Sequence, residues 1–234
     1  GLESFLRKRI IGQDEAIRSV CQRLLMSHTG LAKRRGPLAV FLFLGPTGVG
    51  KTELARSLAE FLFGSDLQLT RFDMSEFMEE HSAAKLIGSP PGYVGHEEEG
   101  QLTGRLRTKP YSVVLFDEVE KAHKRIFDLF LQLFDEGRLT DAKGRTADAR
   151  NAIFIMTSNI AVDKHCNKIG FGDQNTVDLK AIAHQEVKKY FRTEFVNRIN
   201  EIVIFGSLNE EHVKQILRPI VAEICDNIQT KHNV

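Results

Sequence analysis

The segment from Leu38 to Thr52, LAVFLFLGPTGVGKT, decides the fold of this chain. Its first seven residues are all apolar, which is typical of a strand buried on both faces of a parallel sheet. A helix is expected to follow from Lys51 to Phe63, because leucines recur there every four residues along one face. A buried strand, a glycine-rich turn and an amphipathic helix in immediate succession predict an α/β domain.

The rest of the predicted sheet consists of short apolar runs that alternate with helical segments. One such segment is the helix expected from about Lys121 to Asp135. This alternation is typical of a parallel sheet with helices on both faces. We therefore predict a three-layer α/β sandwich around a five-stranded parallel sheet. Its other strands are expected at Leu69–Asp73, Ser112–Phe116, Ala152–Met156 and Glu201–Phe205.

Three connections between these elements are long, namely residues 88–104, 137–151 and 163–176. Connections of this length in a small domain usually carry function. The chain ends in an apolar helical period after the SLNE segment at Ser207–Glu210, which we predict to be a capping box. Pro219 lies inside that period and predicts a kink or an early break of the helix.

The composition of the 234 residues excludes several classes of protein. Lys and Arg number 32 against 31 Asp and Glu, which disfavours a dedicated nucleic-acid binder with its usual basic excess. No apolar run approaches the roughly 20 residues that span a bilayer, and the first residues contain no signal-peptide core. Cys21, Cys166 and Cys225 form no metal or redox motif, which favours a reducing compartment. We expect a cytoplasmic location, with the matrix of a mitochondrion or another organelle as the alternative.

The segment from Gly45 to Thr52 fits the phosphate-loop pattern G-x-x-x-x-G-K-[S/T]. In this pattern backbone N–H groups surround the phosphates at a helix N-terminus, which favours anions. Lys51 would reach the β- and γ-phosphates of ATP, and Thr52 would bind Mg²⁺. A plain connecting turn is the alternative, but a turn needs neither Lys nor Thr at its end. The backbone cradle would come from Pro46, Thr47, Gly48, Val49 and Gly50.

Two carboxylates, Asp117 and Glu118, stand where the apolar run VVLF ends. That edge of a parallel sheet is where ligands bind. Asp117 would hold the Mg²⁺ shell, and Glu118 would polarise the attacking water. An acidic pair after a strand is more often the start of a solvated loop. The phosphate-loop motif earlier in the chain favours the catalytic interpretation.

Two further polar residues are candidates for contacts with the γ-phosphate. Asn159 ends the run IFIMTSN and would orient water, although a polar turn is the alternative. Arg198 precedes the last predicted strand, and nothing local in the sequence neutralises its charge. A ring-forming motor needs an arginine that reaches a neighbour's nucleotide. Spacing alone does not distinguish such a residue from a surface arginine.

Six blocks of the sequence together resemble the second ATPase module of the Clp family of AAA+ proteins. That family contains disaggregases of the ClpB type and unfoldases that feed the ClpP peptidase. The similarity runs from about Ile10 to Phe205, and the blocks SPPGYVGH and RINE most resemble the mitochondrial ClpB-type branch. The six blocks are GPTGVGKTELA, FDMSEFMEEHSAAKLIGSPPGYVGHEE, VVLFDEVEKAH, GRLTDAKGRT, IFIMTSN and EFVNRINEIVIF.

The resemblance implies a role for each motif residue. Asp117 and Glu118 become the Walker B pair, Asn159 the first sensor and Arg198 the arginine finger. The phosphate-loop pair is again Lys51 and Thr52. Further implied are an adenine pocket at Ile10 and Ile11, a substrate-gripping pore loop at Gly92, Tyr93, Val94 and Gly95, and a secondary pore loop around Lys143 and Gly144.

The resemblance also implies two subdomains. Residues 1–206 would form the large nucleotide-binding subdomain, and residues 207–234 the first helix of a small helical subdomain, the start of a C-terminal lid. We expect the chain to be a fragment of a longer protein, without the arginine of the lid that senses nucleotide in this family. The chain departs from the family pattern at Glu99 and Ala161, where Gly is usual, and at Lys124 and Thr193, where Pro is usual.

Tyr93 is also a candidate for substrate contact on physical grounds. An aromatic ring on an exposed loop can wedge between the side chains of any extended peptide. The alternative is that Tyr93 packs back onto its own domain. The residues alone favour neither interpretation, and the resemblance favours gripping.

The predicted function is that of an ATP- and Mg²⁺-dependent motor that threads unfolded or aggregated polypeptide through a homohexameric ring. Lys168–Gly172, KIGFG, resembles the tripeptide with which ClpP-feeding unfoldases dock, so a protease component is the alternative. A short hydrophobic clip would explain the same residues. A DNA-directed AAA+ machine is disfavoured by the balanced charge. A regulator that binds nucleotide without hydrolysis is disfavoured by Glu118.

Overall fold

The structure is a computed structural model that describes residues 1–29, 35–92, 98–160 and 176–232. For residues 176–180 and 223–232 it describes the backbone alone. Tyr93, Val94 and Gly95 of the predicted pore loop lie outside the described residues, and so does the KIGFG segment.

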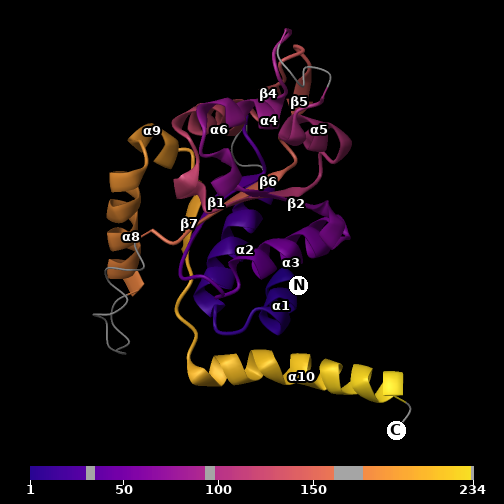
Figure 1. Cartoon of the computed structure of the whole chain (residues 1–234). Coiled ribbons are helices and arrows are strands. Elements are labelled where there is room, and N and C mark those ends of the chain that lie inside the picture. The colour runs from indigo at the N-terminus through magenta and orange to yellow at the C-terminus, as the bar shows by residue number, and fades with distance from the viewer. Residues whose placement is uncertain (30–34, 93–97, 161–175, 233–234) are drawn as a thin grey trace.

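The central sheet has five parallel strands in the order β2-β3-β6-β1-β7 (Figure 1), which confirms the predicted fold class. β1 lies between β6 and β7, so the phosphate-loop motif leaves the sheet near its centre. Strand β6 extends two residues beyond its predicted end, to Ser158. The strands are β1 (Ala39–Leu44), β2 (Leu69–Asp73), β3 (Val113–Asp117), β6 (Ile153–Ser158) and β7 (Glu201–Ile204).

Both faces of the sheet are covered, as the uninterrupted apolar runs predict. Alternate residues of β1 enter different cores: Phe41 and Phe43 pack with the helices of one face, and Leu42 and Leu44 with those of the other. The first face carries α1 (Leu2–Arg9), α2 (Asp14–His28) and α3 (Lys51–Phe63). The opposite core is built with α4 (Ala83–Ile87), α5 (Gln101–Thr108), α6 (Lys124–Glu136), α8 (Thr176–Tyr190) and α9 (Thr193–Val196).

Two of the predicted loops contain regular structure. The connection 88–104 ends inside α5, which begins at Gln101, so the loop prediction is wrong for its last residues. The connection 137–151 forms an antiparallel hairpin of β4 (Arg138–Thr140) and β5 (Thr146–Asp148). Short 3-10 turns occupy Asp66–Gln68, Met74–Phe77, Glu80–Ser82 and Val119–Lys121.

The helix expected from Lys121 begins three residues later. Ala122 is extended, with φ −65° and ψ 140°, and ends the 3-10 turn of Val119–Lys121. His123 then caps α6, because its ring accepts a hydrogen bond from the backbone N–H of Arg125.

The last helix, α10 (Glu210–His232), lies apart from the sheet and its covering helices (Figure 1). Its cap is Asn209, whose Oδ1 accepts the N–H of His212 at 2.8 Å, so the capping box predicted from Ser207 is wrong. The helix continues through Pro219, so the alternative of an early break is wrong. An apolar stripe on the helix is exposed, formed by Val213, Leu217, Ile220 and Val221. None of the helices in the described ranges has the length and apolar character that a membrane crossing requires.

Candidate active site

A cavity of about 530 Å³ lies at the carboxyl ends of β1, β3 and β6. It brings together residues from three separate motifs of the sequence, because parallel strands end at the same edge of a sheet. Eight predicted site residues line it: Thr47, Gly48, Gly50, Lys51, Thr52, Asp117, Glu118 and Asn159. The remaining lining residues are Glu53, Arg56, Arg71, Asp73, Thr157 and Ser158.

The phosphate-loop segment turns sharply between β1 and α3. Gly48 has φ +80° and Gly50 has φ +107°, values that favour glycine. The Lys51 ammonium lies inside the turn and donates to the carbonyl oxygens of Gly45 at 2.5 Å and Pro46 at 2.7 Å. Val49 faces the core instead, and neither Val49 nor Pro46 is among the lining residues of the cavity. A cation and a 13-residue helix N-terminus thus share one concave turn, which suits phosphate oxygens.

Burial lowers the pKa of the Lys51 ammonium below its ordinary value, and the nearby carboxylates, Asp117 foremost, oppose that shift. A partly buried cation without a full set of charged partners is a favourable site for an anion. The charge of the turn and its concave shape therefore both favour the binding of a phosphate group.

Asp117 is held on both oxygens by residues of the two strands that flank β3. The hydroxyl of Thr157 on β6 donates to Oδ1, and Nε of Arg71 on β2 donates to Oδ2 at 3.0 Å. A second nitrogen of Arg71, Nη2, also reaches Oδ2. The Asp117 side chain is 15% exposed, whereas that of Arg71 is 55% exposed. The carboxylate is thus fixed in orientation at the cavity wall.

Glu118 has a left-handed backbone, with φ 55° and ψ 53°. Among the described residues it is the only non-glycine with a positive φ. Its N–H donates to Oγ1 of Thr157 at 3.1 Å, and its carboxylate pairs with Lys121 at 2.5 Å. Such a backbone costs about 1–3 kcal/mol, and strained residues of this kind cluster at functional sites. Glu118 combines this backbone with a carboxylate at the cavity.

Asn159 is exposed at the cavity, as its predicted contact with ligand requires, whereas Thr157 and Ser158 are buried. Thr157 contacts both members of the acidic pair, through its hydroxyl to Asp117 and as acceptor for Glu118. The prediction missed Thr157 as a site residue. No local pattern marks it, because its contact with Asp117 depends on β6 lying beside β3.

Gln13 is a second residue that the prediction missed. Its side chain is 3% exposed, and its Nε2 donates to the carbonyl oxygens of Val49 at 3.2 Å and Gly206 at 2.8 Å. Its Oε1 accepts the N–H of Gly206 at 3.0 Å. One buried carboxamide therefore joins the phosphate-loop segment to the connection between β7 and α10. Of the predicted adenine-pocket residues, Ile10 is buried against Gly50 and Ile11 is partly buried.

Arg198 is not among the lining residues of this cavity. Its guanidinium donates to both carboxylate oxygens of Asp135, at 3.0 Å each, and to the carbonyl oxygen of Glu194 at 2.9 Å. The hydrogen bonds that Arg198 donates to Asp135 raise the pKa of Arg198 above its ordinary value. The main counter-charge of Arg198 is therefore Asp135, and Glu194, four residues earlier, lies at 3.9 Å. Asp135 lies on α6, far from Arg198 in sequence, and the fold brings the two together.

The predicted secondary pore loop is the turn of the β4–β5 hairpin, where Gly144 has φ +78°. Asp141 anchors this turn with its carboxylate, which accepts the N–H groups of Lys143 at 3.0 Å and Arg145 at 2.8 Å. Arg145 and Arg107 also pair with Glu99, the residue that departs from the family pattern. The unusual Glu99 thus links the end of the first long connection to this turn.

The donor atoms at the cavity fit Mg²⁺. Thr52 and Asp117 supply a hydroxyl and a carboxylate, hard oxygens that Mg²⁺ prefers. In the described part of the chain no group of three or more His, Cys, Asp or Glu is arranged to hold a metal. Mg²⁺ takes one or two protein oxygens and completes its shell with phosphates and water, so Thr52 and Asp117 would suffice as its protein ligands.

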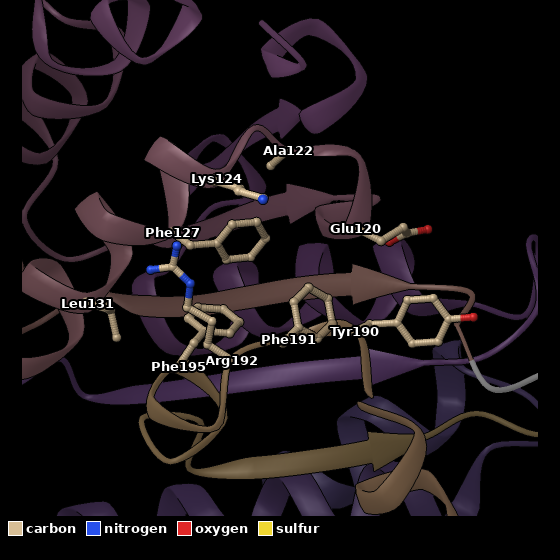
Figure 2. A pocket seen from close by; sticks show the side chains of 9 residues that line it. All are labelled: Glu120, Ala122, Lys124, Phe127, Leu131, Tyr190, Phe191, Arg192 and Phe195. Carbon is tan, nitrogen blue, oxygen red and sulfur yellow. The ribbon is translucent and has the colours of Figure 1, made fainter. Parts of the chain in front are cut away.

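A second cavity, of about 430 Å³, is more apolar (Figure 2). It lies between α6 and the segment of α8 and α9, and none of the predicted site residues lines it. Glu120 stands at one end, and both of its carboxylate oxygens are buried without a hydrogen-bond partner among the described residues. The wall consists of Glu120, Ala122, Lys124, Phe127, Leu131, Tyr190, Phe191, Arg192 and Phe195.

Comparison with known proteins agrees with this site. Residues 36–202 match the family described as AAA domain (Cdc48 subfamily). The chain is 51% identical over 222 residues to the negative regulator of genetic competence ClpC/MecB of Bacillus subtilis, which covers 92% of the chain. It is 48% identical over 238 residues to the chloroplastic chaperone protein ClpC3 of Oryza sativa, which covers 98% of it. It is 48% identical over 229 residues to the chaperone protein ClpB of Oceanobacillus iheyensis, which covers 95% of it. The chain spans about a quarter of these relatives, between 26% and 28% of their length.

Proposed function

This chain belongs to the AAA domain family of the Cdc48 subfamily, and we propose that it is the ATP-hydrolysing motor of a Clp-type protein unfoldase. One observation carries the proposal. The phosphate-loop pair, Lys51 and Thr52, shares a single cavity with the acidic pair, Asp117 and Glu118. Binding and hydrolysis of a nucleoside triphosphate need both pairs in one place.

Within this proposal each pair has its own task. The Lys51 ammonium leaves the carbonyl oxygens of Gly45 and Pro46 for the β- and γ-phosphates, where its charge is better matched. Glu118 takes the proton of the attacking water. The hydrogen bond from its backbone N–H to Thr157 holds the backbone of Glu118, and with it the start of the side chain, in place. Asn159, exposed at the same cavity, orients the water.

Mg²⁺ would be held by Thr52 and Asp117, and when bound it neutralises charge that develops on the phosphates. Thr157 and Arg71 keep the Asp117 carboxylate in position before nucleotide arrives. Ile10, packed beside Gly50, and Ile11 would contact the adenine.

The proposal extends to assembly and substrate. Arg198 would serve the site of a neighbouring copy in a hexameric ring, and Tyr93 would grip a polypeptide in the central pore. The relatives named chaperone proteins support a polypeptide substrate. The exposed apolar stripe of α10 supports the assignment of residues 207–234 to a small helical subdomain. The chloroplastic and bacterial relatives support a cytoplasmic or organellar-matrix location.

The test of hydrolysis is a pair of variants in the complete protein. Glu118→Gln should keep nucleotide affinity and lower ATP turnover by about 10²–10⁴-fold, the usual contribution of a general base. Lys51→Ala should lose nucleotide binding itself. Turnover that survives Glu118→Gln would contradict the assignment of the base.

The test of the unfolding activity is Tyr93→Ala. ATP turnover should continue, and unfolding of a stably folded substrate should stop. Unfolding at the wild-type rate would refute the gripping role. The protease alternative is tested separately, by degradation of casein in the presence of ClpP. Absence of degradation would remove that alternative.

A further inference from the structure

Two arginines that no motif predicts, Arg56 and Arg71, line the candidate active site. They differ in what they contact. Arg56 pairs with Glu53 on its own helix, at 3.4 Å. Arg71 reaches from β2 to the neighbouring strand β3 and places two nitrogens on one oxygen of Asp117. Arg71 therefore contacts Asp117, the residue proposed to bind Mg²⁺, whereas Arg56 does not.

We propose that Arg71 is an internal counter-cation of Asp117, which a divalent cation must displace from Oδ2. This inference rests on the proposed function, because it assumes that Asp117 belongs to the metal shell. It assigns Arg71 as a positioning residue, one that acts through Asp117.

The occupancy of the carboxylate supports the proposal. Oδ1 of Asp117 accepts from the hydroxyl of Thr157, and Oδ2 accepts from Arg71. Thr157 is 1% exposed on the central sheet, so its hydrogen bond stays with the fold. Oδ2 is thus the oxygen whose partner can be exchanged, and that partner is a cation.

Exposure decides which member of the pair moves. The Asp117 side chain is 15% exposed, and that of Arg71 is 55% exposed. A largely buried carboxylate without a counter-charge is costly, whereas an exposed guanidinium loses little when it turns into water. Arg71 can therefore leave once another cation takes its place on Asp117.

The released guanidinium remains at the wall of the same cavity. Arginine binds phosphate oxygens well, because its planar donors match their geometry. The exchange would thus remove a positive charge from Asp117 and make it available to the triphosphate. When the metal ion binds without nucleotide, the released guanidinium has no phosphate to contact. Arg71 therefore raises the metal concentration that is needed to fill the site.

The experiment compares Arg71→Gln with Arg56→Gln in the complete protein. Bound Mn²⁺, used in place of Mg²⁺, is counted by electron paramagnetic resonance without nucleotide, where the released guanidinium has no phosphate to contact, and ADP binding is measured separately. Arg71→Gln should lower the Mn²⁺ midpoint by about two- to fivefold, the equivalent of one weak ion pair. Arg56→Gln removes the same charge from the same cavity and should shift the midpoint less. Arg71→Lys keeps the charge without the fork of two donors and should fall between wild type and Arg71→Gln.

The outcomes separate this inference from the proposed function. An Arg71→Gln midpoint equal to or above that of wild type, or a shift no larger than that of Arg56→Gln, overturns the counter-cation role. Wild-type protein that binds no ADP and no Mn²⁺ overturns the proposed function instead. Thermal unfolding checks that each variant is folded, and if Arg71→Gln is not, Arg71→Lys against Arg56→Lys carries the comparison.

Discussion

Arg198 donates one hydrogen bond to each carboxylate oxygen of Asp135, both at 3.0 Å, so the proposed arginine finger is held within its own chain. To reach a neighbour's γ-phosphate it must exchange this carboxylate for phosphate oxygens. The pair is partly exposed, with side chains 27% and 49% accessible, so the exchange is inexpensive.

The first prediction concerns this pair. Arg198→Ala should lower kcat for ATP by about 10³–10⁵-fold in the assembled protein, the range of arginine fingers, with little change in nucleotide affinity. Asp135→Asn frees the arginine and should keep turnover at or above the wild-type value. Steady-state ATPase rates and nucleotide Kd values check both. A loss of turnover in Asp135→Asn as large as that in Arg198→Ala would show that the pair is structural.

The second prediction concerns Thr157, which joins Asp117 to the backbone of Glu118. Thr157→Val removes the buried hydroxyl and leaves Asp117 with one fixed oxygen. The free energy of unfolding should fall by about 1–3 kcal/mol, and turnover should fall roughly tenfold or more, about 1.4 kcal/mol in the barrier. Thr157→Ser retains the hydroxyl and should restore most of the turnover. Equal ATP turnover rates for Thr157→Val and Thr157→Ser would contradict a role of the Thr157 hydroxyl in the site.

The third prediction concerns the close approach of Gly45 to Phe205. A Cβ at Gly45 would lie 2.7 Å from Cβ of Phe205 and 2.8 Å from its carbonyl oxygen. Gly45→Ala should therefore cost about 1–3 kcal/mol of stability and weaken nucleotide binding, because the phosphate loop starts here. Gly206→Ala is the control, since among the described residues no atom beyond its two chain neighbours lies within 4 Å of the added carbon. Chemical denaturation should show near wild-type stability for the control, and a tolerated Gly45→Ala would contradict the packing argument.

The fourth prediction concerns the β4–β5 turn and pH. Burial raises the pKa of Asp141, but the hydrogen bonds from the backbone and side chain of Arg145 outweigh it, so that the pKa lies below its ordinary value. A depressed pKa means that the carboxylate stabilises the fold above its ordinary pKa, about 4, and loses this effect as pH falls through the folded value. Asp141→Asn should cost about 1–3 kcal/mol at neutral pH.

The difference between wild type and Asp141→Asn should shrink as pH falls below about 4, measured by urea denaturation across a pH series. Asp148 on the same hairpin is the control. Its side chain is 46% exposed and pairs with Arg150, so Asp148→Asn should change stability by less than about 1 kcal/mol. A difference for Asp141→Asn that does not depend on pH would contradict the role of its charge.

Local patterns in the sequence predicted much of the fold and part of the site. The bounds of β2 and α3 match their predicted ranges, because both depend on short-range apolar periodicity and turn chemistry. Asp117 and Glu118 fall in the cavity because their motif stands at the end of β3, and Lys51 does so because the loop after β1 places it at the start of α3. The cap of α10 was predicted at Ser207 and lies two residues later, at Asn209. Serine and asparagine are both good capping residues, so the sequence alone does not distinguish the two positions.

The parts that were missed depend on which strands and helices become neighbours. Arg71 and Thr157 contact Asp117 only because β2 and β6 flank β3, and no local pattern contains that order. Asp135 lies 63 residues from Arg198 in sequence, so a search for a local counter-charge could not find it. Gln13 reaches two segments that are close only in the folded chain.

The buried carboxamide of Gln13 has a mechanical consequence. Because it bonds Val49 on one side and both backbone groups of Gly206 on the other, a pull on the last helix is transmitted to the loop at β1. A displacement of α10 relative to the sheet would therefore act through Gln13 on the turn around Lys51. Gln13 thus couples the position of the segment before α10 to that of the phosphate-loop segment.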